Sequence, residues 1–289
     1  MTGDEAIQLR QPLPAHRSYQ QVLHHYQVEK ALADQLKATD RAGRARIYGT
    51  MYDELFREVP DHPRLSRRQD EQASDHANRG KLALLRPVLA ADRIVLEFGS
   101  GDCAFMAMLA GQVREVIAVD ISDQRDPQRR FPDNLRHVVY DGFELDTVQA
   151  SSVDIAFSDQ LIEHLHPEET AAHLRLVSRL LKPGGCYVLN TPHPMNGPHD
   201  VSKYFSNVAQ GFHLKEWSFT ELAALLRQNG FSRIQARWSA RQINLPLPML
   251  LVRLMEAGLA RLPPAWARRL SRYALPTVAI VAWKDSKAT

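Results

Sequence analysis

The run RIVLEFGSGDCAF, residues 93–105, decides the fold of this chain. It opens with an apolar segment of strand length, which Gly99 and Gly101 interrupt before the apolar stretch 104–110 resumes with helical character. Because glycine has no Cβ atom, such a turn lets a ligand lie against bare backbone at the start of a helix. A second short strand, EVIAVD, ends at Asp120, about twenty residues further on, where a nucleoside-binding unit places its ribose-binding carboxylate. The pattern predicts a nucleoside-cofactor site.

The segment GSGDCA, residues 99–104, also fits the looser dinucleotide-binding pattern with alanine in the third place. A dinucleotide would set its pyrophosphate at the helix N-terminus, where Glu97 and Asp102 would add two negative charges. S-adenosylmethionine has no phosphate and carries a cationic sulfonium and an ammonium group, so acidic residues suit it. The charges therefore favour S-adenosyl-L-methionine over a nicotinamide cofactor.

Three later segments extend the pattern in order: YDG at 140–142, FSDQLIEHLHP at 157–167 and LKPGG at 181–185. Together with the first two, they resemble the motifs of class I S-adenosylmethionine-dependent methyltransferases, particularly the small-molecule group with an EHL segment after strand four. The resemblance covers roughly residues 82–238. Each motif alone is weak evidence, but five motifs in the right order and spacing are strong evidence. It implies an α/β Rossmann-like fold with a seven-stranded, mostly parallel sheet, helices on both faces and a reversed last strand. One departure is Cys103, which stands where the family has its third glycine.

The expected cofactor contacts follow from the spacing and from this resemblance. Asp120 would accept both ribose hydroxyls, because a carboxylate can accept two charge-assisted hydrogen bonds at once. Glu97 would orient the glycine turn and meet the ammonium group. The remaining expected contacts are the turn residues Gly99, Ser100 and Gly101, Ile121 on the adenine face, Asp141 with Gly142 at the adenine amine, and Ser158 with Gln160 near the methionine end.

Histidines are the candidates for proton transfer, because an imidazole near its ordinary pKa can act as a base at neutral pH. The candidate catalytic residues are His164, His213 and His193, with His166 and His199 in the same segments after strands four and five. For His164, the resemblance favours a role in bracing backbone over proton transfer. Alignment of the acceptor can supply roughly 7–11 kcal/mol by itself, so catalysis without a base stays open. No metal-ligand spacing appears, and no metal is expected.

Composition narrows the class of protein. A net charge of +3, with basic residues spread along the chain, does not favour nucleic acid as a partner. The first twenty residues are polar and contain proline, unlike a secretory signal, and no apolar run is long enough to span a bilayer. Cys103 and Cys186 are expected to be reduced packing residues, so a cytoplasmic location is expected.

The chain divides into a helical cap over residues 1–80 and a methyltransferase domain over residues 81–289. The cap shows helical spacing at 18–36, at 45–59 and from about 75 onward. The domain alternates strands and helices, and residues 122–134 are expected to be mostly loop. Strands are expected at 93–98, 115–120, 135–140, 153–158, 185–191, 231–238 and 277–284, and helices at 103–112, 168–181 and after the capping box at 218–221.

The acceptor site should use the segments that depart from the bare core: the cap, the loop 191–217 and an insert at 240–276. The insert is rich in leucine and methionine, yet its prolines prevent one long helix. We expect it to be a lid that forms one wall of a mainly apolar acceptor pocket. The alternative is a surface for an amphipathic acceptor or weak peripheral contact with a membrane, with arginines as its polar rim.

These observations predict methyl transfer from S-adenosyl-L-methionine to a small-molecule or lipid-like acceptor, with oxygen favoured over nitrogen or carbon. Two alternatives remain. One is an NAD(P)-dependent oxidoreductase, which the acidic turn and the LKPGG segment disfavour. The other is a non-catalytic binding subunit that keeps the methyltransferase fold. Neither the acceptor nor the oligomeric state follows from the sequence.

Overall fold

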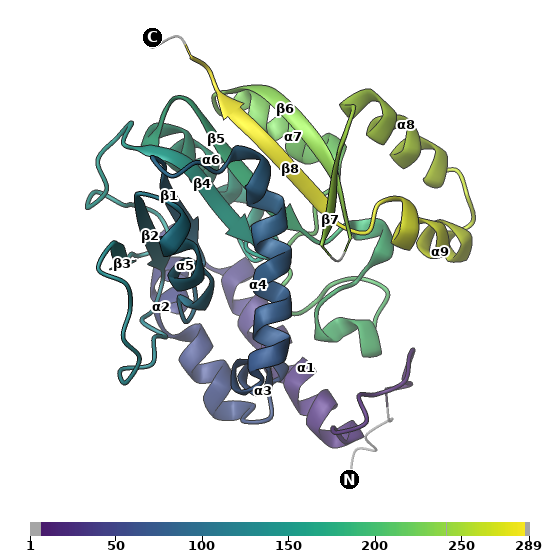
Figure 1. Ribbon diagram of the computed structural model, residues 1–289. Coiled ribbons are helices and arrows are strands. Elements are labelled where there is room, and N and C mark those ends of the chain that lie inside the picture. Colours follow the sequence, from purple (N-terminus) through teal and green to yellow (C-terminus); the bar gives the residue numbers. More distant parts are fainter. Residues whose placement is uncertain (1–6, 241, 287–289) are drawn as a thin grey trace.

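A mixed sheet of eight strands runs through the protein, whose computed structural model describes residues 7–240 and 242–286 (Figure 1). The strand order is β3-β2-β1-β4-β5-β8-β6-β7. The strands are β1 (Ile94–Phe98), β2 (Glu115–Asp120), β3 (Leu135–Val139), β4 (Val153–Asp159), β5 (Leu181–Thr191), β6 (Phe231–Ala240), β7 (Ile243–Leu247) and β8 (Val278–Lys284). Strands β1 to β5 pair in parallel, whereas β8 is antiparallel to both β5 and β6. The predicted Rossmann-like class with a reversed strand near the end of the chain is confirmed.

The sheet has one strand more than the seven predicted. The additional strand is β7, which lies inside the 240–276 insert and pairs with β6 from Ala240↔Ile243 to Ala236↔Leu247. Pro246 lies within this strand, although proline cannot donate a hydrogen bond to a neighbouring strand. At the edge of a sheet one side of the strand needs no partner, so β7 tolerates this proline.

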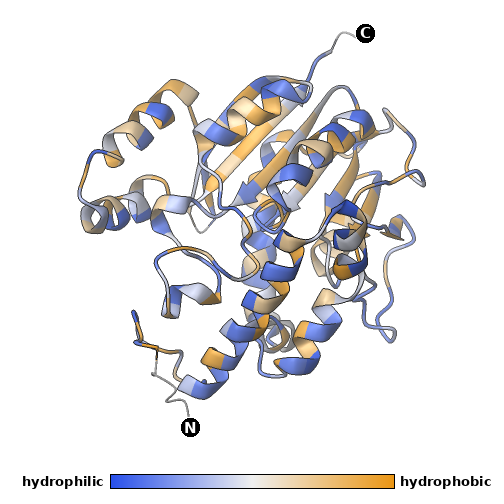
Figure 2. Ribbon diagram, turned by 180° about the vertical axis from the view of Figure 1, so that it is seen from behind, coloured by the Kyte–Doolittle hydropathy of each residue, from blue (hydrophilic) through white to orange (hydrophobic). Residues whose placement is uncertain are grey.

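Helices cover both faces of the sheet, and successive strand residues face opposite layers. In β1, Val95 packs with α4 (Glu71–Leu85) and α5 (Ala104–Leu109). Its neighbour Leu96 belongs to the hydrophobic cluster on the other face, which also contains buried residues of α6 (Pro167–Leu180), α7 (Phe219–Gln228) and α8 (Met249–Leu259). Figure 2 shows the result, with hydrophobic strands lying between helices whose outer faces are largely hydrophilic. Burial on both faces is what the near-continuous apolar runs of β1, β2 and β4 require.

The N-terminal helices α1 (Tyr19–Ala38), α2 (Arg41–Glu58) and α3 (Pro63–Gln69) lie across the carboxyl end of the parallel strands (Figure 1). Their own core joins leucines of α1 with Tyr48, Met51 and Leu55 of α2 and with Phe212. The predicted helices at 18–36 and 45–59 are thus present, and α2 begins four residues earlier than expected because Asp40 caps it by accepting from the Gly43 amide.

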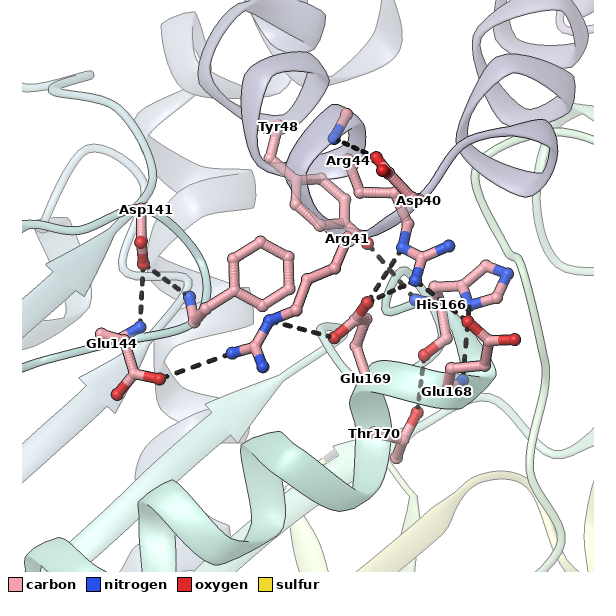
Figure 3. A network of polar contacts seen from close by, with 12 residues as sticks. Asp40, Arg41, Arg44, Tyr48, Asp141, Glu144, His166, Glu168, Glu169 and Thr170 are labelled. Atoms are coloured by element: carbon pink, nitrogen blue, oxygen red, sulfur yellow. Dashed lines mark hydrogen bonds and ion pairs between the residues drawn. The ribbon is translucent and has the colours of Figure 1, made fainter.

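An ion-pair network centred on the buried pair Arg44–Glu169 fastens the cap to the domain (Figure 3). Arg44 is nearly buried and donates to Glu169 at the start of α6 at 2.6 Å, and to Glu168 at 3.0 Å. Arg41 lies 3.4 Å from Glu144. Removing one partner would leave the buried charge uncompensated, so this network holds α2 in one position over the sheet edge.

The insert continues from β7 into α8 and α9 (Pro264–Ala274), which lie together at one edge of the molecule (Figure 1). None of the helices within the described ranges is both long and apolar enough to cross a membrane. Both cysteines are buried and free of disulfides.

Candidate cofactor and acceptor site

The glycine turn after β1 has the backbone shape that its sequence predicts. Gly99 and Gly101 have φ values of +73° and +57°, in the left-handed region that favours glycine. The Gly99 amide donates to the Val119 carbonyl at 2.8 Å, which ties the turn to the end of β2. Cys103 also lies in the left-handed region, with φ +59°, and its side chain is fully buried. A cysteine therefore adopts the conformation of the missing third glycine, although few non-glycine residues do so.

Asp120 lies at the end of β2 against this turn and is almost completely buried. Its Oδ2 accepts from the Gly101 amide at 2.7 Å, and its Oδ1 accepts from the Ile121 amide at 2.8 Å. The carboxylate thus also holds the turn in shape. Each carboxylate oxygen can accept a further hydrogen bond, so these contacts are compatible with the ribose role predicted for Asp120.

Glu97 lies behind the turn, fully buried. Its Oε1 accepts from Lys81 Nζ of α4 at 3.0 Å, and its Oε2 is buried with no hydrogen-bond partner in the structure. Burial raises the pKa of this carboxyl to about 7, although the ion pair with Lys81 opposes the rise. No hydrogen bond joins the Glu97 carboxylate to the turn. The unpartnered oxygen suits a cationic group, as the ammonium of S-adenosylmethionine would provide.

A cavity of about 560 Å³ opens beside the turn, within the size range of small-molecule sites. Of the expected cofactor contacts, it is lined by Gly99, Ser100, Gly101, Asp120, Ile121, Gly142 and Gln160. Further lining residues that the sequence did not single out are Tyr140, Asp159 and Leu161 from the domain, and Glu29, Tyr48, Met51, Tyr52, His62 and Arg64 from the cap. Asp159 lies within the FSDQ segment, residues 157–160, and could have been found there, whereas the cap residues are brought in only by the fold.

Three expected contacts are not among the residues that line the cavity, and the fully buried Glu97 is one of them. Ser158 is buried beneath it and hydrogen-bonds Tyr187 at 2.6 Å. Asp141 accepts from the Phe143 and Glu144 amides, each at 2.8 Å, and so shapes the loop after β3. Its neighbour Gly142 faces the cavity instead, with φ +89°.

Titratable side chains gather in the part of the cavity that the cap and the loop 191–217 supply. His199, Asp200 and His213 enter it from the loop together with Phe212, and Glu29, His62 and Arg64 enter it from the cap. The acceptor pocket that was expected to be mainly apolar thus also contains charged groups. The insert 240–276 was expected to form a wall, yet no described residue of it lines this cavity. The helices α8 and α9 instead lie beyond the edge of the sheet, because β7 carries the chain outward from β6.

Two of the candidate histidines line the cavity and differ in basicity. His164 donates from Nδ1 to the Phe212 carbonyl at 2.9 Å, and burial together with the nearby His213 lowers its pKa to about 3. His213 hydrogen-bonds Glu216 through Nδ1 at 2.8 Å. Burial by itself lowers the pKa of His213, but the bond to Glu216 and the charge of Glu163 outweigh it and raise the pKa above its ordinary value.

The third candidate, His193, is fully buried outside the cavity. Its Nε2 lies 3.0 Å from a Glu256 oxygen of α8, and its Nδ1 accepts from the Met195 amide. Both ring nitrogens are therefore engaged in holding α8 to the domain. Glu256 lies in the distant insert, so no local sequence pattern indicates this pairing.

Two groups of side chains bring possible metal ligands within 4.8 Å of one another, although no metal was expected. In the first, formed by His25, Glu29 and His62, Arg17 approaches His25 Nδ1 at 3.0 Å as a donor. The His25 Nε2 must then carry the proton that it shares with Glu29 at 2.8 Å, which leaves this ring no lone pair for a metal.

The second group is Glu163, His164 and His213. Both rings use Nδ1 to bond the Phe212 carbonyl and Glu216, an outer-shell pattern that leaves Nε2 available. Glu163 Oε1 is buried without a hydrogen-bond partner. This is a donor set that a divalent transition metal accepts, and it escaped the sequence analysis because His213 is far along the chain from the other two.

Comparison with known proteins agrees with this geometry. A sequence model described as a methyltransferase domain matches residues 67–236, more than half of the chain. The chain belongs to the methyltransferase domain family. The membership confirms the resemblance inferred from the motifs, and with it S-adenosyl-L-methionine as the cofactor predicted for this methyltransferase domain. No curated protein sequence matches the chain.

Solved structures share the fold of this methyltransferase domain at low identity. A methyltransferase from Haloferax volcanii, in complex with the Trm112 activator, is 19% identical with a TM-score of 0.54, over 75% of this chain and 94% of that one. The YcgJ protein of Bacillus subtilis is 18% identical with a TM-score of 0.51, over 73% and 100%. Phosphoethanolamine N-methyltransferase 1 of Haemonchus contortus is 17% identical with a TM-score of 0.57, over 84% of this chain and 50% of that one. At such identities the likeness shows the fold alone.

Proposed function

We propose that this chain transfers the methyl group of S-adenosyl-L-methionine to a hydroxyl oxygen of a small polar or amphipathic acceptor. The observation that supports the proposal is the shared cavity. It connects the glycine turn and Asp120 at one end with a rim of titratable side chains at the other, supplied by the cap and the loop 191–217. Donor and acceptor can therefore meet in one enclosed space, and such positioning accounts for a large part of methyl-transfer catalysis.

The cofactor end fits the nucleoside. Asp120 accepts the ribose hydroxyls, and Ile121 lies against the adenine. Gly142 lines the same cavity at φ +89°, a backbone conformation that favours glycine. Oε2 of Glu97 is buried and has no hydrogen-bond partner within the protein. It would accept a hydrogen bond from the ammonium group and compensate its charge.

The acceptor end fits a hydroxyl compound. Glu29, Asp200 and the imidazoles of His62 and His213 can each accept a hydrogen bond from a hydroxyl group. The cofactor supplies an electrophilic methyl group, and the sulfide that leaves needs no proton. As the acceptor oxygen bonds to the methyl carbon, its proton passes to Nε2 of His213. Glu216 holds the ring from Nδ1 and stabilises the imidazolium that results.

His164 has a positioning role in this proposal. Its low pKa makes it a poor base at neutral pH, and its bond to the Phe212 carbonyl anchors the loop that carries His213. The two buried, unpaired cysteines accord with a reducing compartment, and we place the activity in the cytoplasm.

Two measurements test the function. Calorimetric titration with S-adenosyl-L-methionine and with NADH should show binding of the first only, and the reverse result would favour the oxidoreductase alternative. Mass spectrometry of a cell extract should then reveal a metabolite that gains one methyl group with the wild-type protein and not with Asp120→Ala. Cofactor binding without a methylated product from any extract fraction would favour the non-catalytic binding subunit.

A further inference from the structure

A second hollow lies outside the methyltransferase cavity and is strongly basic. Its volume is about 360 Å³, and its lining includes the cations Arg10, Lys203, Arg268 and Arg272 but no carboxylate. Within the described ranges, none of these four side chains forms an ion pair. The nearby Glu216 lies behind Gly197, where it accepts hydrogen bonds from His199 and His213. The hollow therefore concentrates positive charge that the protein does not neutralise.

The walls of this basic hollow are held in place. Asn196 is mostly buried and donates to the Leu275 carbonyl at 2.8 Å, just beyond α9. Ser271 of α9 is fully buried and hydrogen-bonds the Asn196 side chain. These bonds fix α9, and with it Arg268 and Arg272, against the segment that supplies the opposite wall.

The helix α9, which lines the hollow, and its neighbour α8 expose apolar side chains on their outer faces. In α8, the buried residues Val252 and Leu259 lie on one side, whereas Leu250 and Leu254 are 70% and 62% exposed on the other. Figure 2 shows hydrophobic colour on α8 at the outer edge of the molecule. The exposed apolar residues of β7, α8 and α9, with the turn between the helices, are Ile243, Leu245, Leu250, Leu251, Leu254, Leu262, Trp266, Leu270 and Tyr273. An exposed apolar surface of this extent on adjoining elements is typical of a site that binds a protein or a membrane.

Charge indicates what that partner is. The segment 249–274 carries five arginines and one acidic residue, Glu256, which is buried and paired with His193. In α9, Trp266, Leu270 and Tyr273 follow one another at helical spacing, while Arg268 and Arg272 lie on the opposite side. An arginine-rich polar face with leucine, tryptophan and tyrosine on the other face is typical of a helix that lies in a membrane interface.

We propose that the α8–α9 hairpin docks this protein on an anionic phospholipid bilayer, and that the basic hollow binds a lipid phosphate group. The apolar face enters the outer acyl region, while the cations of the hollow and the exposed Arg253 and Arg269 attract the headgroups. The proposal does not depend on methyl transfer. It does bear on it, because His199 lines both the basic hollow and the main cavity, which places lipid headgroups next to the acceptor end.

Co-sedimentation of the full chain with vesicles tests the proposal. Phosphatidylcholine vesicles with about 30% phosphatidylglycerol should bind the protein at least roughly tenfold more tightly than pure phosphatidylcholine vesicles, and the difference should shrink as salt is added. Arg268→Gln with Arg272→Gln should remove most of this preference. Leu250→Ser with Leu254→Ser should weaken binding to both vesicles.

Matched control variants test whether the location of the substituted residues matters, and not only the change in net charge or apolar surface. Arg129→Gln with Arg130→Gln makes the same change of charge on a remote exposed loop, and Val208→Ser removes an apolar residue that is 60% exposed outside the hairpin. Both should bind as the wild type does, with unchanged circular dichroism for every variant. Binding to neither vesicle, equal binding to both, or equal losses from the two arginine pairs would overturn the proposal. A dimer in sedimentation velocity that Leu250→Ser with Leu254→Ser dissociates, without vesicle binding, would assign this face to a second copy of the chain.

Discussion

Replacing Glu97 by glutamine tests how the buried carboxylate behind the glycine turn is used. In the cofactor-free protein, burial raises the pKa of this group from its ordinary 4.5 to about 7, a difference that corresponds to about 3 kcal/mol. The unfolded chain releases the proton near pH 4.5 and the folded chain near pH 7. Between these values the folded state holds one more proton, so this group lowers the free energy of unfolding as the pH rises through the window.

Glutamine has nearly the same shape and does not titrate. We therefore expect the free energy of unfolding of Glu97→Gln, relative to wild type, to rise by about 3 kcal/mol between about pH 4.5 and about pH 8. The substitution also removes the ion-pair partner of Lys81. This loss should shift the free energy of unfolding by the same amount at each pH, because Asp159 also stabilises the charge of this lysine. Urea unfolding at a series of pH values measures the difference, and other titrating groups cancel in it.

Glutamine at position 97 should stabilise the fold at high pH but weaken cofactor binding. At about pH 8 the Glu97 carboxylate is ionised and its free Oε2 can meet the ammonium group, so Glu97→Gln should weaken S-adenosyl-L-methionine binding by roughly tenfold or more. Glu163→Gln is the matched control, because burial raises the pKa of Glu163 to about 7 as well and one of its oxygens is also unpartnered. It should change the slope of stability with pH but leave cofactor affinity nearly unaltered. A relative stability that is flat with pH, or equal cofactor affinities for wild type and Glu97→Gln, would refute this account of Glu97.

Three further predictions follow from the site. Asp120→Ala should weaken S-adenosyl-L-methionine binding more than tenfold in calorimetry, because it removes ribose contacts and the bond to the Gly101 amide that holds the turn, each contributing roughly 1.5–3 kcal/mol; unchanged affinity in a folded variant would exclude Asp120 from the site. Gly101→Val should abolish cofactor binding with little change in circular dichroism, since a β-branched residue is strained at φ +57°; normal affinity would show that the loop is misassigned. His213→Gln should lower kcat by roughly a hundredfold or more with cofactor affinity unchanged, whereas His164→Gln should lower Tm more than kcat. Equal, small effects on kcat from both would favour catalysis by alignment alone.

The local chemistry of the cofactor end was legible in the sequence. Glycines that need left-handed backbone, a carboxylate at the end of a strand and apolar runs of strand length each act over a few residues. These features gave the parallel core, the turn at Gly99 to Gly101 and the location of Asp120, all of which the structure contains. Periodicity likewise predicted the cap helices, with boundaries a few residues from those observed.

The acceptor end depended on contacts between residues far apart in the chain, which no local pattern encodes. The cap brings Glu29 and His62 into the cavity, and the Arg44 ion pairs fasten its helix α2 to α6. The loop 191–217 brings His213 into the same cavity. The polarity of this end, the pairing of His193 with Glu256 and the outward position of the insert all follow from such contacts. The sequence by itself determined which cofactor the protein is built to hold, because a few adjacent residues make that site. Only the tertiary structure decided which side chains surround the acceptor and which apolar face remains exposed, because burial and electrostatic environment are properties of the folded packing and not of any one segment.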